Sequence, residues 1–125
     1  IVFLNNTDTV APQVSLNSPL SGATLSSDFS VTGSISDLLT NGNSANELHQ
    51  IEISVEPEGG GTERVVALYD NTDEINGVWD AGTGSFSATG LDFPNNTESG
   101  NNVLSLTVWD RYFNKSTATV SIVVN

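Results

Sequence analysis

Hydrophobic and polar residues alternate with a period of two along the last part of the chain, residues 102–125. Such a period places every second side chain on one face of a β-strand. The aliphatic positions of the two halves are Leu104, Leu106 and Val108, then Ala118, Val120, Ile122 and Val124. Two such runs joined by a short polar loop are typical of a β-hairpin. Because an isolated hairpin is only marginally stable in water, other segments must cover its apolar face.

Five earlier segments have strand character and are separated by turn residues. They lie at 14–16, 29–35, 51–56, 62–69 and 86–88. The segment 62–69 shows no clear phase, because its four central residues are all apolar. No stretch of adequate length has a helical period. About seven short strands separated by turns predict an all-β protein: an immunoglobulin-like Greek-key sandwich of two antiparallel sheets.

The charge of the chain is strongly negative, with 15 acidic residues against three basic ones and a net charge of −12. This excludes nucleic acid as a partner, because phosphate binding needs a basic face. It also disfavours an anionic membrane surface. There is no cysteine, which excludes disulfides, thiolate metal sites and cysteine nucleophiles. We expect the isolated domain to be a monomer that is kept soluble by its charge.

The first residues, IVFL, are similar to the last ones, IVVN. This similarity suggests a unit from a tandem array, in which residues 1–9 are a linker or the last-strand remnant of a preceding repeat. Residues 10–125 would then form the sandwich. The alternative is that residues 1–4 are an ordinary first strand. The chain has no run of about 20 apolar residues and no signal-peptide pattern, so a secretion signal would lie outside it.

Short motifs flank several of the predicted strands. They comprise Asp8, Ala11, Pro12, Ser18, Pro19 and Gly22 around the first strand and turn, Ser36 and Asp37 after the second, Gly100 and Asn101 before the sixth, and Asp110 and Asn114 around the last loop. Together the segments that contain them resemble the repeated immunoglobulin-like modules of large bacterial surface proteins and adhesins. The resemblance covers nearly the whole chain and implies a multi-domain protein that is secreted or on the cell surface. One departure is Tyr112-Phe113, where those modules usually have a small residue and a glycine.

The predicted topology gathers acidic residues at one end of the sandwich. Eight of the fifteen acids fall in loops at that end: Asp8, Asp37, Glu47, Asp70, Asp73, Glu74, Asp80 and Asp110. Crowded carboxylates favour a hard cation, and Ca²⁺ takes about 6–8 oxygen ligands. The expected calcium ligands are Asp8, Asp37, Asp110 and Asn114. The alternative is that these acids are solvated loop residues.

Aromatic residues occur in the same loops. Trp79, Trp109, Tyr112 and Phe113 could stack on a sugar ring, or Trp79 could plug one end of the core while Trp109 packs across a sheet. The second interpretation is the one we favour. An exposed and contiguous set formed by Trp79, Tyr112 and Phe113 would indicate a binding module. A buried Trp79 would favour a spacer.

The sequence contains no pattern that indicates catalysis. His49 is the only histidine, and no nucleophile-elbow motif or glycine loop for an oxyanion accompanies it. The glycines at 59–61 have no lysine and helix after them, so they form a turn rather than a phosphate cradle. The expected function is therefore that of a non-catalytic spacer or interaction module. The alternative is a module that binds carbohydrate or protein through the loops 70–84 and 110–114.

Overall fold

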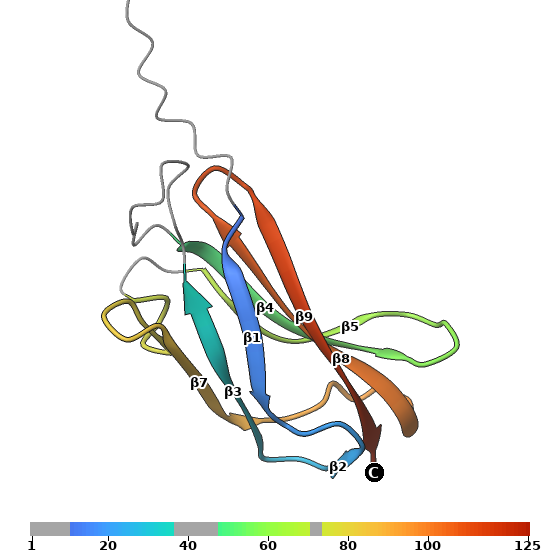
Figure 1. Ribbon diagram of the computed structural model, residues 1–125. Helices are drawn as coiled ribbons and strands as arrows, with labels where there is room; N and C mark the ends of the chain where they lie inside the picture. Colours follow the sequence, from blue (N-terminus) through green and yellow to red (C-terminus); the bar gives the residue numbers. More distant parts are fainter. Residues whose placement is uncertain (1–10, 37–47, 71–73) are drawn as a thin grey trace, which may run out of the picture.

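The computed structural model describes residues 11–36, 48–70 and 74–125 (Figure 1). These residues form nine strands and no helix. The strands are β1 (Gln13–Ser18), β2 (Ala23–Leu25), β3 (Phe29–Ser36), β4 (Leu48–Pro57), β5 (Arg64–Tyr69), β6 (Trp79–Asp80), β7 (Ser85–Leu91), β8 (Gly100–Asp110) and β9 (Lys115–Val124). The predicted all-β class is confirmed. The residues 1–9, predicted to be a linker or strand remnant, lie outside the described part.

The strands form two layers. One sheet has four strands in the order β1-β3-β7-β6, and the other has five in the order β2-β9-β8-β4-β5. Three connections, β4–β5, β6–β7 and β8–β9, join neighbours within one sheet, and the other five cross from one sheet to the other, as expected for a Greek-key sandwich. This strand order shows an immunoglobulin-like fold.

The predicted first strand is β1, and a short strand that the sequence pattern does not predict follows it in the other sheet. A turn at residues 19–22 separates β1, which pairs with β3, from β2, which pairs with β9. The β2–β9 pair is parallel, with Ala23 opposite Ile122 and Leu25 opposite Val124. All the other strand pairs of the described residues are antiparallel. The short strands β2 and β6 raise the number of strands from the expected seven or so to nine.

The core lies between the sheets and is built from the alternation seen in the sequence. In β3 every second side chain is buried, and the same holds for the central parts of β4 and β8. The large aliphatic residues that are fully enclosed are Val31, Ile35, Ile51, Ile53, Val55, Ile75, Leu104, Leu106, Val108 and Ile122. Burial of each such side chain stabilises the fold by about 1.5–3 kcal/mol.

Close approach of β1 to β3 depends on a glycine. A Cβ at Gly33 would overlap the carbonyl oxygen of Ser15 on β1. Gly33 itself lies opposite Leu16 in the β1–β3 pair and opposite Phe86 in the β3–β7 pair. A glycine within a strand often marks such a close backbone approach.

The end of the sandwich where the chain leaves is closed by a buried asparagine. Asn102, at 1% exposure, donates from Nδ2 to the carbonyl oxygens of Glu98 and Gly100, at 2.9 and 3.1 Å. Glu98 lies in the connection between β7 and β8, and Gly100 is the first residue of β8. Since a buried amide donor without a partner costs about 1–3 kcal/mol, the bond to Glu98 fixes this connection to the core.

Residues 62–69 lack a clear alternation of apolar and polar positions, and the structure shows why. The β4–β5 register shifts between Ile53 and Ser54, which face Ala67 and Val65. Val66 is therefore an extra residue on β5, a β-bulge. Because the bulge reverses the alternation halfway along the strand, no single period of two runs through it.

Candidate functional site

One end of the sandwich, here called the entry pole, collects the candidate residues. β1 begins there and β3 ends there, with Gln13 opposite Ser36. β4 begins and β8 ends at the same pole, with Leu48 opposite Asp110. Figure 1 shows the β8–β9 hairpin tip at this end and the C-terminal Asn125 at the other. The prediction that these strand ends share one pole is thus confirmed for the described residues.

Asp110 is the centre of the loop between β8 and β9. Its side chain is fully buried, at 0% exposure. Oδ1 accepts from the backbone N–H groups of Tyr112 and Asn114, at 2.8 and 2.9 Å, and Oδ2 accepts from Asn114 Nδ2 at 2.9 Å. The backbone adds a bond from Asp110 N–H to the Asn114 carbonyl. Asp110 and Asn114 are therefore brought together, and the carboxylate organises the hairpin loop.

The predicted calcium ligands are only partly described. Asp8 and Asp37 lie outside the described residues, as do Glu47 and Asp73 of the wider acidic cluster. Within the described residues the other acids of that cluster, Asp70, Glu74 and Asp80, are exposed. No three histidine or acidic side chains of the described residues form a group that could hold a metal ion. The calcium site stays a prediction.

Trp79 is part of the core, as expected for a plug at the entry pole. Its side chain is 5% exposed, and Nε1 donates to the carbonyl oxygen of Ile35 at 2.9 Å. The backbone N–H of Ile35 in turn donates to the carbonyl of Gly84, at 2.8 Å. The indole N–H thus provides a hydrogen-bond donor for the carbonyl of Ile35, near the end of β3. This burial removes Trp79 from any exposed aromatic set.

Tyr112 and Phe113 remain exposed at the tip of the β8–β9 hairpin, at 37% and 70%. Phe113 has a φ of 65°, in the left-handed region that favours glycine. Its ring lies edge-on to that of His49, with centroids 5.3 Å apart. His49 is exposed near the start of β4, where the β4–β8 register shifts. The lone histidine therefore contacts an aromatic ring of the hairpin tip.

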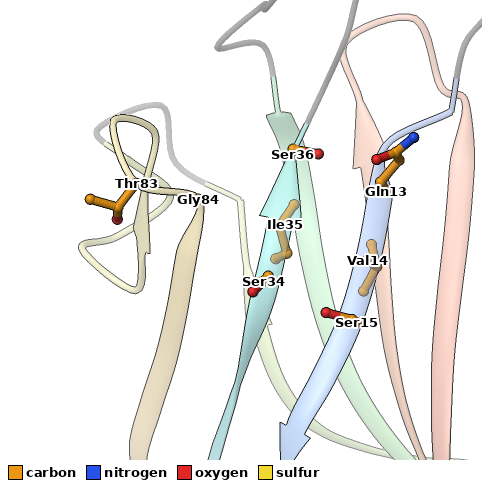
Figure 2. Close-up of a pocket in the computed structure, with 8 residues that line it drawn as sticks. All are labelled: Gln13, Val14, Ser15, Ser34, Ile35, Ser36, Thr83 and Gly84. Atoms are coloured by element: carbon orange, nitrogen blue, oxygen red, sulfur yellow. The ribbon is translucent and has the colours of Figure 1, made fainter.

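A pocket at the entry pole is formed by the start of β1, the end of β3 and the β6–β7 hairpin (Figure 2). It has a volume of about 380 Å³. Its lining consists of Gln13, Val14, Ser15, Ser34, Ile35, Ser36, Thr83 and Gly84. The hydroxyl and amide groups of this set can exchange hydrogen bonds with a neutral polar ligand. No sequence pattern indicates this pocket, because serine and threonine at alternate strand positions are typical of an ordinary exposed sheet face.

Comparison with known proteins adds little to what the strand order shows about the fold. No family model matches the chain, and no curated protein matches its sequence. Among solved structures, that of murine CRIg is similar over 93% of this chain and 98% of that chain, with 14% identity and a TM-score of 0.46. The immunoglobulin-like fold therefore rests on the two sheets and their connections. No helix of the described residues is long and apolar enough to cross a membrane.

The Asp110 network leads to a stability prediction. Replacement of Asp110 by alanine should lower the free energy of unfolding by about 2–4 kcal/mol, because it removes a buried charged acceptor and leaves three partly buried N–H donors of the loop without it. Urea unfolding would measure this loss. Asp80→Ala is the control, since the exposed Asp80 carboxylate also accepts a loop amide, from Gly82 at 2.8 Å. That control should cost about 0.5 kcal/mol. Equal losses in the two variants would contradict a special role for Asp110.

Proposed function

We propose that this chain is a non-catalytic structural module of a larger secreted or cell-surface protein, of the kind found repeated in bacterial surface proteins. The observation that carries this proposal is the placement of the described chain ends. β1 begins at the entry pole, and the chain ends with Asn125 at the opposite pole (Figure 1). Modules with this arrangement can be joined end to end, so that each holds the next at a fixed distance. The buried Trp79 supports a spacer rather than an aromatic ligand platform.

The strand pairing suits a module that carries tension. Force applied at the two ends acts along β1, which is paired with β3 over residues 13–18, and along β9, which is paired in parallel with β2. Two further backbone bonds join the β2 region to β9: Gly22 N–H to the Ser121 carbonyl at 2.8 Å and Asn125 N–H to the Leu25 carbonyl at 2.9 Å. When force acts along paired strands, many of the hydrogen bonds between them must break at the same time.

Single-molecule force spectroscopy tests this mechanical function. Because the chain has no cysteine, handles can be attached at chosen positions. Gln13→Cys with Asn125→Cys loads the molecule from pole to pole. Asn101→Cys with Asn125→Cys is the control, because these residues lie at neighbouring ends of β8 and β9 and the pair opens one bond at a time. We expect a severalfold higher unfolding force in the first geometry. Equal or lower force would argue against a tension-bearing spacer.

Calcium at the entry pole would stiffen the junction with a preceding domain. The bonds described above occupy three of about four lone-pair positions of the Asp110 carboxylate. Asp110 can therefore give a cation at most one more oxygen contact. Asp8, Asp37, backbone carbonyls and water would have to supply most of the about 6–8 ligands that Ca²⁺ takes.

The calcium proposal predicts a specific pattern of melting temperatures. Ca²⁺ should raise the melting temperature of the wild type by several degrees relative to EGTA, because a ligand that binds only the folded state stabilises it. Asp8→Asn and Asp37→Asn should lose this increase and melt like the wild type in EGTA. Asp28→Asn, at the opposite pole, should keep it. No heat of Ca²⁺ binding and no shift in the wild type would remove calcium from the function.

A second candidate function is ligand binding at the β8–β9 tip, through Tyr112 and Phe113. Its support is that Phe113 keeps a large exposed side chain in a backbone conformation where glycine would be less strained. A residue whose backbone conformation lowers local stability suggests a function other than stability, such as binding. A glycan is one ligand class for such a pair, since aromatic faces stack on sugar rings, and a protein loop is another.

Phe113→Gly separates binding from stability. The variant should be as stable as the wild type or up to about 1 kcal/mol more stable, because glycine adopts a positive φ without strain. It should lose binding to any glycan that the wild type captures from a panel. Leu20→Gly removes an exposed apolar side chain at the other pole and is the control. A panel without a binder, or a binder that Phe113→Gly retains, would reject the tip as a glycan site.

A further inference from the structure

β5 forms an open edge of the five-stranded sheet. Among the described strands it pairs only with β4, so one side of its backbone has no strand partner there. An edge strand presents a row of N–H and C=O groups to which another strand can add. The sequence of β5, RVVALY, contains no proline, glycine or lysine to oppose such addition.

The other sheet edges are less suited to strand addition. β2 has three residues and β6 has two. β1 has six residues but lies between Pro12 and Pro19, which cannot donate a backbone hydrogen bond. β5, with six residues, is therefore the edge that offers the longest run without a flanking proline.

The β-bulge at Val66 creates an apolar surface beside this edge. In a regular strand Val65 and Leu68, three positions apart, would face opposite sides. Here Val65 lies opposite Ser54 and Leu68 opposite Glu52, two residues that share the outer face of β4. Both side chains are accordingly exposed, at 49% and 48%. Two aliphatic side chains thus lie on the same solvent face of the open strand.

Carboxylates surround these two side chains. Glu63 immediately precedes β5, and its Oε2 accepts from the Ser54 hydroxyl at 3.0 Å. Glu52 lies on the same face, where burial and then the charge of Glu63 raise its pKa above the ordinary value, while Lys115 lowers it. Asp70 follows the other end of β5 and is exposed. The apolar pair therefore has a carboxylate at each end of the strand, Glu63 and Asp70, and a third, Glu52, on its inner side.

We propose that the β5 edge binds an extended segment of another polypeptide by strand addition, and that this segment has alternating aliphatic residues between basic ones. Its backbone would pair with β5, its aliphatic side chains would pack on Val65 and Leu68, and its basic side chains would face Glu63 and Asp70. The charge decides between occupants. A second copy of this chain also carries −12 and is repelled, whereas a basic segment is attracted.

A peptide titration followed by NMR of the ¹⁵N-labelled chain tests this inference. The probe is the capped peptide Lys-Thr-Val-Thr-Val-Thr-Lys at low ionic strength. We expect saturable shifts and slowed amide exchange centred on residues 63–70. The same peptide with glutamate at both ends, and one with proline at its centre, should bind at least about tenfold more weakly. Equal binding of either control peptide, or shifts that do not centre on β5, would overturn the proposal.

Variants of the chain provide the matched controls. Leu68→Lys and Val65→Lys should each weaken binding at least about tenfold, because a lysine on the edge opposes strand addition and repels a basic segment. Leu20→Lys changes a side chain that is 74% exposed at the opposite pole and should bind as the wild type does. Equal loss in Leu20→Lys would contradict the assignment. A dimer in sedimentation that Leu68→Lys abolishes would overturn it in favour of a second copy.

Discussion

The inner face of β8 is the constraint on which the rest of the structure depends. It presents Leu104, Leu106 and Val108 to the core, with Asn102 before them and Asp110 after them, and all five are buried. The aliphatic centre holds the two sheets together through the hydrophobic effect. The polar residue at each end reaches out of the core to a loop: Asn102 donates to two loop carbonyls, and Asp110 accepts from two loop amides. One strand therefore fixes the sheet spacing and one loop at each pole.

The fold class could be predicted because period-two alternation depends only on which side chains face the core. That pattern is intact in β3, β8 and β9, and their positions follow from the sequence. Two features could not be predicted. The short strand β2 depends on where the 19–22 turn directs the chain and on pairing with β9, about 100 residues later. The phase of β5 depends on a bulge that no local pattern reveals.

The candidate site shows the same division between local and long-range information. Burial of Trp79 was the favoured expectation, since a large apolar ring is rarely left in water, yet its bond to the Ile35 carbonyl depends on the packing of β3 against the β6–β7 hairpin. The resemblance to bacterial surface modules and the predicted topology single out Asp110 and Asn114, and the two side chains do meet. What neither could show is that the carboxylate is used by its own loop. An aspartate in a loop looks the same in sequence whether it holds backbone amides, a cation or water.

The proposed tension-bearing and binding functions use different edges of the five-stranded sheet. Its order places β2 at one edge and β5 at the other, with β9, β8 and β4 between them. Force between the poles passes through β1, β2 and β9, whereas a segment added to β5 extends the opposite edge. Such a segment needs no hydrogen bond that the loaded strands use, so its binding does not weaken them. The bulge that exposes Val65 and Leu68 lies in the β4–β5 pair, also away from the loaded strands. A spacer can therefore hold a partner along its length while it is under load, because the two functions depend on separate sets of backbone hydrogen bonds.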